Sequence, residues 1–146
     1  MGAFTRRLLM TLAVAFAFVG GLNAEQMISS GHYQVHYQAL ATTFLPPEVA
    51  ANYGIKRSRY TGLLNVSVLD QAQDGKPATA ATLKGVARNL LGHRIELDFK
   101  EIREGQAIYY IAEVPHSNEE TYRFDIQIAT QDSTINLKFE HKFYVD

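Results

Sequence analysis

The sequence TINLKFEHKFYV, residues 134–145, decides the fold because polar and apolar side chains alternate along it. Successive side chains of a β-strand point to opposite faces, so this stretch predicts a strand with one buried and one solvated face. His141 falls on the apolar side, and we interpret it as a buried neutral imidazole that is hydrogen-bonded to the backbone or to a tyrosine. The apolar side consists of Ile135, Leu137, Phe139, Phe143 and Val145.

The same alternation appears upstream in TYRFDIQI, residues 121–128, and in RIELDF, residues 94–99. Ile102 breaks the phase of the second stretch, which indicates a bulge. AIYYIA, residues 107–112, is apolar on both sides and is typical of a central strand. Further strands are expected at about residues 31–43, 60–69 and 80–90. Seven short strands without a long helical pattern predict an all-β, antiparallel, immunoglobulin-like β-sandwich.

One short helix is expected in the connection between the first two strands. Pro47 suits the first helical position, Glu48 lies in the first turn, and Gly54 stands just past the end.

The first 24 residues predict a cleavable signal peptide. Arg6 and Arg7 form a positive start, an apolar run covers residues 8–19, and small or turn-forming residues lead to Ala24. The run is shorter than the about 20 apolar residues that a membrane-spanning helix needs. We therefore expect general secretion, residues 1–24 as the leader, residues 25–146 as one domain, and a periplasmic location.

Net charge and the absence of cysteine limit the kinds of partner and chemistry that are expected of the exported domain. Removing Arg6 and Arg7 takes the whole-chain charge of −1 to about −3, which argues against nucleic acids and anionic membranes. The absence of cysteine excludes disulfides, thiol catalysis and a lipid anchored on cysteine. We expect a soluble domain that is stabilised by packing alone.

No catalytic or metal-binding pattern stands out. His32 and His36 are four residues apart, which on a strand places them about 13 Å apart, too far to share an ion. Glu96 and Asp98 share a face, but their cationic neighbours indicate a solvated surface. We therefore expect neither enzymatic activity nor a cofactor nor a metal.

Two surfaces are candidates for an interaction or ligand site. The first follows the predicted helix and comprises Tyr53, Lys56, Arg57 and Arg59, whose cations could bind a carboxylate. The alternative is that this connection only covers an open end of the sandwich. The second candidate surrounds the turn at Gly92 and comprises Arg88, Asn89 and His93, with Arg94 beside them.

Several stretches carry a family resemblance along nearly the whole exported part of the chain. They include YQVHY at residues 33–37, GLLNV at 62–66, ARNLLG at 87–92, EIREG at 101–105 and KFYVD at 142–146. The chain resembles a family of small exported proteins of Gram-negative bacteria that is a domain of unknown function. The resemblance implies a periplasmic β-sandwich and supplies no catalytic residues.

The leading hypothesis is a non-enzymatic periplasmic module that binds another, unknown protein. The absence of a catalytic constellation and the exposed sheet edges of a sandwich motivate it. The alternative is a periplasmic protein that binds a small ligand or a metal, motivated by Tyr53, Arg57, Arg59 and the five histidines.

Overall fold

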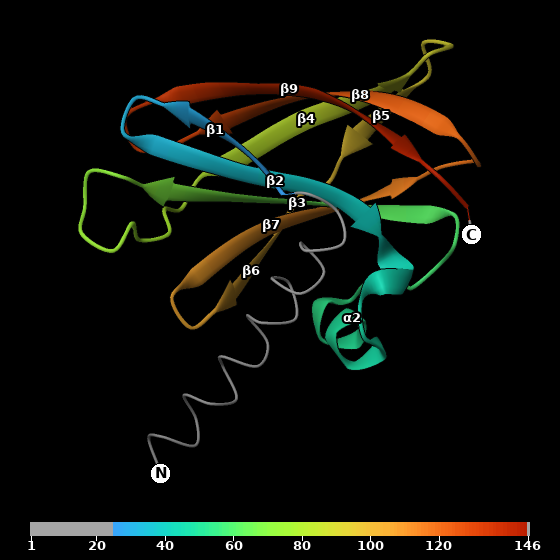
Figure 1. The fold of residues 1–146 in the computed structure, drawn as a ribbon, viewed down its shortest axis with the longest axis horizontal. Helices are drawn as coiled ribbons and strands as arrows, with labels where there is room; N and C mark the ends of the chain where they lie inside the picture. Colours follow the sequence, from blue (N-terminus) through green and yellow to red (C-terminus); the bar gives the residue numbers. More distant parts are fainter. Residues whose placement is uncertain (1–24, 146) are drawn as a thin grey trace.

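Two antiparallel sheets pack face to face in the computed structural model, which describes residues 25–145 (Figure 1). The predicted signal peptide lies outside the described residues. The five-stranded sheet has the order β1 (Gln26–Ser30), β2 (Tyr33–Ala41), β3 (Thr61–Asp70), β7 (Ala107–Pro115) and β6 (Lys100–Glu104). The four-stranded sheet has the order β5 (Arg94–Leu97), β4 (Thr82–Asn89), β8 (Glu120–Ala129) and β9 (Thr134–Phe143).

This architecture confirms the predicted all-β sandwich, with nine strands rather than seven among the described residues. One extra strand is β1, whose five residues carry no clear alternation of polar and apolar side chains. The other arises because residues 94–104 form two strands. β5 pairs with β4 in one sheet, and β6 pairs with β7 in the other. The phase break at Ile102 therefore marks a chain that crosses between the sheets.

The main core lies between the two sheets and follows the predicted alternation. Many inward side chains of both sheets are at most 2% exposed. Removal of such apolar surface from water is the main favourable contribution to folding. The set includes Val35, Leu64, Val66, Val68 and Val114 from the five-stranded sheet, and Phe124, Ile126, Ile128 and Leu137 from the other.

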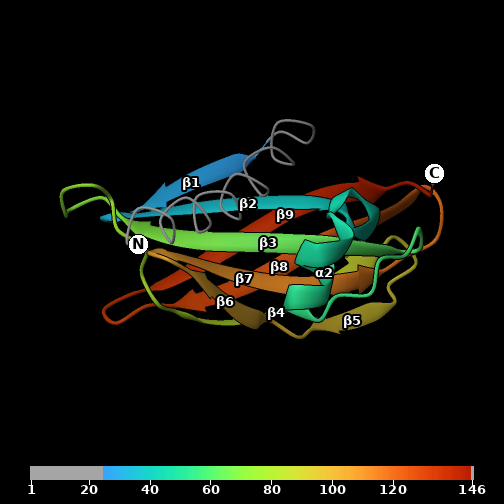
Figure 2. The ribbon, with the colours of Figure 1, turned by 90° about the horizontal axis from the view of Figure 1, so that it is seen from below.

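A short helix covers part of the outer face of the five-stranded sheet (Figure 2). The helix α2 (Pro47–Tyr53) follows the 3₁₀ turn η1 (Thr42–Phe44) and begins at the proline that the sequence indicated. Gly54 ends it with φ of 68°, a left-handed conformation that glycine adopts without steric cost. The helix buries a second apolar cluster of Leu40, Leu45, Val49, Ala50, Tyr53, Ile55, Leu63 and Ile111.

Within residues 25–145, none of the helices is both long enough and apolar enough to span a bilayer.

Candidate functional site

Tyr53 belongs to the interior and not to a surface site. Its side chain is only 5% exposed, and its hydroxyl donates a hydrogen bond to Oε1 of Glu104 on β6. Burial, followed by the Glu104 carboxylate, raises the pKa of Tyr53 well above its ordinary value. The main-chain oxygen of Tyr53 also accepts a hydrogen bond from Nζ of Lys100 at 2.9 Å. Tyr53 therefore fastens α2 to the sheet.

The three cations after α2 are exposed, whereas Tyr53 is buried, so the four side chains do not form one surface. Nη2 of Arg57 donates to the main-chain oxygen of Thr43 at 2.9 Å, which ties the segment to η1. Lys56 and Arg59 form no ion pair with another described residue. The connection covers part of the outer face of the five-stranded sheet, rather than an open end of the sandwich.

Asn89, in the second candidate surface, organises the turn between β4 and β5. Its Oδ1 accepts hydrogen bonds from the backbone N–H groups of Leu91 and His93, at 3.0 and 2.8 Å. Its Nδ2 donates to Oε2 of Glu120 at 3.1 Å. Burial opposes ionisation of Glu120, but hydrogen bonds, first from Ser117 and then from Asn89, act with the nearby His116 to lower the pKa of the carboxyl group. Asn89 thus holds the turn in place, and His93 lies exposed at its end.

Arg88 is part of a row of three arginines that cross the outer face of the four-stranded sheet. In the strand register, Arg88 on β4 lies directly opposite Arg94 on β5 and Arg123 on β8. All three side chains are exposed, and opposite residues of an antiparallel pair have Cβ atoms about 4.5–5.5 Å apart. We call Arg88, Arg94 and Arg123 the arginine row.

The arginine row carries more positive charge than its neighbours neutralise. Arg94 pairs with Glu96 at 3.4 Å, and Arg123 pairs with Glu140 at 3.2 Å. Arg88, between them, forms no ion pair with any residue in 25–145. Like charges directly opposite each other in a sheet are destabilising, by about 0.2–1 kcal/mol per pair. Repulsion within the arginine row therefore lowers the stability of the fold, and a bound anionic group would reduce that repulsion.

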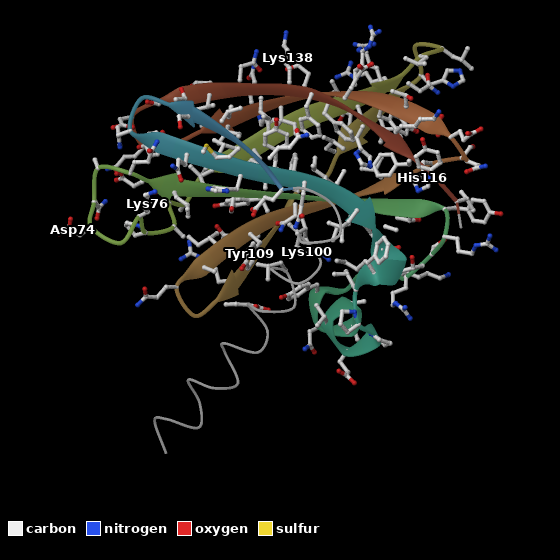
Figure 3. All side chains as sticks on the ribbon, in the orientation of Figure 1. Asp74, Lys76, Lys100, Tyr109, His116 and Lys138 are labelled. Atoms are coloured by element: carbon white, nitrogen blue, oxygen red, sulfur yellow. The ribbon has the colours of Figure 1, made fainter. Side chains whose placement is uncertain are left out.

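A depression of about 570 Å³ adjoins the arginine row on the same sheet. Arg88 and Arg123 line it together with Lys138, which projects outward from β9 (Figure 3). Lys138 lies 3.9 Å from the carboxylate of Asp125, so this part of the surface is closer to electrical balance.

Two leucines stand exposed at the end of the hairpin that carries Arg88 and Arg94. Leu90 is 66% exposed and Leu91 is 83% exposed. In Figure 1 the turn that holds them rises above the ribbons of the four-stranded sheet. The site thus combines cationic side chains on a rigid sheet with an apolar tip, which is a combination suited to another macromolecule.

Within the described part of the chain, His, Cys, Asp and Glu side chains do not gather in groups of three or more that could hold a metal ion. His36 lies on β2, whereas His32 lies in the turn before it. His141 is half-buried at the inner side of β9, edge-on to Phe143 with 4.6 Å between the ring centroids. Burial, followed by the nearby His116, lowers the pKa of His141, in keeping with a neutral imidazole. Its ring forms no hydrogen bond with another described residue, in contrast to the expected bond to backbone or tyrosine.

Comparison with known proteins finds a solved structure that is similar in sequence as well as in fold. A crystal structure of a DUF4426 family protein from Pseudomonas aeruginosa PAO1 shares 32% sequence identity with a TM-score of 0.74. The match covers 84% of this chain and 96% of that protein.

A more distant likeness concerns the fold alone. FetP of uropathogenic Escherichia coli strain F11, in a copper-bound variant, has 11% identity and a TM-score of 0.58, over 83% of this chain and 95% of that one. The same protein, expressed recombinantly in the periplasm, gives a TM-score of 0.59 at 11% identity, over 84% and 95% of the two chains. No curated protein matches this chain.

Residues 27–146 match the family described as Domain of unknown function (DUF4426), which agrees with the resemblance found in the sequence. The chain therefore belongs to the DUF4426 family, which has a member in a Gram-negative bacterium.

Proposed function

We propose that this protein is an exported, non-enzymatic interaction module that binds an acidic surface of another protein through the arginine row. The observation that carries the proposal is the direct cross-strand placement of Arg88, Arg94 and Arg123, which pair with two carboxylates within residues 25–145. Guanidinium groups bind carboxylates through two parallel hydrogen bonds, so an acidic segment lying across the strands would satisfy all three.

The apolar tip favours a protein partner over a free anion. Leu90 and Leu91 lie at the end of the same hairpin as Arg88 and Arg94, and exposed leucines gain nothing from a small anion. In an interface they would bury apolar area beside the charged contacts, as the centre of protein interfaces commonly does. Because Asn89 holds the turn, the tip is presented with little loss of conformational freedom on binding.

An exported location rests on two supports. The first 24 residues have the pattern of a signal peptide. FetP, a neighbour in fold alone, was expressed in the periplasm. The proposed partner is accordingly another protein of the periplasm.

The test is cross-linking in intact cells followed by pull-down of the tagged protein and mass spectrometry. We expect one dominant partner, with recovery at least tenfold lower for Arg88→Glu and for Leu91→Ser. Lys84→Glu is the matched control, because Lys84 is exposed on the same strand and faces Gln127 in the register.

Two outcomes would count against the proposal. Absence of any enriched partner would remove the interaction function. Recovery that survives Arg88→Glu but is lost with Arg57→Glu and Arg59→Glu would place the site after α2 instead.

A further inference from the structure

A separate cavity of about 290 Å³ lies at the five-stranded sheet, on the opposite side of the molecule from the arginine row. Outward side chains of β2 and β3 line it in matched pairs, with Gln38 opposite Asn65 and His36 opposite Ser67. Tyr109 of β7, whose position is labelled in Figure 3, also lines the cavity. Its volume is near the lower end of the about 300–1,000 Å³ common for ligand pockets.

Two residues that line this cavity each carry a buried hydrogen-bond acceptor that has no donor among the described residues. Gln38 is 6% exposed and Asn65 is 7% exposed. Gln38 Oε1 and Asn65 Oδ1 have no hydrogen-bond partner among the described residues. Buried polar atoms in folded proteins are nearly always hydrogen-bonded, so two orphaned acceptors on neighbouring strands indicate a missing donor.

Two carboxylates lie close to the cavity or to a residue that lines it. Glu25 lies at its edge, with Oε1 3.6 Å from Nδ1 of His36. The other ring nitrogen of His36, Nε2, is 3.2 Å from Oε1 of Gln34. Burial, and then the charges of Glu104 and Glu25, raise the pKa of Tyr109, so both carboxylates act on the tyrosine that lines the cavity.

The remaining wall is apolar and is formed by Leu69, Ala78, Ala107 and Ile108. A ligand that fits must therefore carry hydrogen-bond donors and positive charge at one end and a short carbon chain at the other.

We infer that this cavity binds a small primary amine as its ammonium ion, with N–H groups donating to Gln38 Oε1 and Asn65 Oδ1. The carbon chain packs against Leu69 and Ala107, two apolar residues that line the cavity. A metal ion fits the cavity less well, because Glu25 and His36 are the two members of the common metal-ligating types among its lining residues.

Calorimetry with the purified protein tests the ligand class. The probes are n-butylamine and putrescine, with 1-butanol, butyrate, Ca²⁺ and Cu²⁺ as comparisons. We expect saturable binding of the amines and at least tenfold weaker binding of butanol and butyrate. Absence of saturable amine binding, equal binding of butanol, or binding of a metal ion alone would overturn the inference.

Near-isosteric variants test the two acceptors. Gln38→Met and Asn65→Leu keep the side-chain volume and remove the orphaned oxygen. We expect amine affinity to fall at least tenfold while Tm stays equal or rises, because a buried unsatisfied group has been removed. Gln127→Met, an exposed amide on the four-stranded sheet, is the matched control and should bind as the parent does.

Arg88→Glu separates this inference from the interaction proposal. Because the arginine row is on the other sheet, this variant should bind amines normally even where it loses its protein partner. Unchanged amine affinity in both Gln38→Met and Asn65→Leu would show that the amine does not occupy this cavity.

Discussion

His32 and Asp70 form a hydrogen-bonded pair, with Nδ1 of the imidazole 2.8 Å from Oδ1 of the carboxylate. The other ring nitrogen, Nε2, lies 3.1 Å from Oδ2 of Asp132 in the turn between β8 and β9. Asp70 ends β3, so this histidine links the two sheets at one end of the sandwich. Two carboxylates on one imidazole favour its doubly protonated form.

The His32 link predicts a stability maximum in mildly acidic solution. Hydrogen bonds to Asp70 and then Asp132 raise the pKa of His32 above its ordinary 6.5. This contribution to stability is therefore complete below pH 6.5 and is lost as the pH rises through the folded-state pKa. The pKa of Asp70 is lowered, first by the hydrogen bond from His32. The pKa of Asp132 is lowered first by Tyr33 and then by His32. The stability that these two carboxylates contribute is therefore present above pH 3.8 and is lost as the pH falls through their folded-state pKa values.

Urea unfolding between pH 3 and 9 measures this dependence. We expect His32→Gln to remove the decline above pH 6.5, while His93→Gln, in an exposed turn, should keep it. A parent protein whose stability is flat from pH 6 to 8 would contradict the prediction.

His141 should act in the opposite direction. Burial lowers its pKa, and His116, which stacks on Phe143 at 4.7 Å between ring centroids, lowers it further. Below pH 6.5 the unfolded chain takes up the proton more readily than the folded chain, so acid costs stability at this residue. His141→Phe should lose less stability than the parent between pH 7 and 5. NMR titration should show His141 titrating below His32, and the reverse order would refute both assignments.

Loss of the Tyr53 hydroxyl should destabilise the attachment of α2. The hydroxyl donates to Glu104, a carboxylate whose other oxygen is buried without a partner among the described residues. Removing a donor from a buried acceptor costs about 1–3 kcal/mol. Tyr53→Phe should therefore lower the free energy of unfolding by that amount. Tyr60→Phe, at a tyrosine that is 58% exposed, should change it by less than about 0.5 kcal/mol.

Gly62 on β3 cannot accept a side chain without rearrangement of the core. A Cβ atom added there would overlap the ring of Phe143, which is only 3% exposed. Overpacking of a filled core costs about 1–3 kcal/mol, and we expect Gly62→Ala to show a loss of this size in urea unfolding. Gly62→Ala with Phe143→Leu should lose less than the sum of the two single changes. Strict additivity would contradict this contact.

The arginine row should give a salt-dependent stability effect. Arg88→Gln removes the central charge between Arg94 and Arg123. We expect it to raise the free energy of unfolding by about 0.2–1 kcal/mol at low ionic strength. The gain should disappear near 1 M salt, where the Debye length is about 3 Å. Lys84→Gln is the control, and an equal gain there would show that the loss of any cation from this sheet has the same effect.

The elements with strong local patterns could be predicted from sequence. Residues 134–145 alternate because one face of β9 is buried, and Pro47 and Gly54 bound α2 because their backbone preferences hold at any position in a fold. In residues 94–104 the sequence pattern showed a phase break at Ile102 but did not show that the segment forms two strands. Whether such a break is a bulge or a crossing between sheets depends on which strand each half pairs with, and that choice is not local.

The candidate site was only partly predictable for the same reason. Arg88 stood out beside Arg94 because the two are close in sequence, whereas Arg123 lies on another hairpin and joins them only through the register of β4 with β8. Tyr53 was grouped with exposed cations because it is adjacent to them in sequence, but α2 turns it towards the sheet.

The sequence by itself determined an all-β sandwich with one short helix, since alternation, proline and glycine act over a few residues. The tertiary structure alone decided which side chains from distant strands face one another. Gln38 meets Asn65, His32 meets Asp132, and Arg88 meets Arg123 through pairings and contacts that span 27 to 100 residues. Such contacts depend on strand register and sheet packing, which are set by the burial of the whole core and by no single segment.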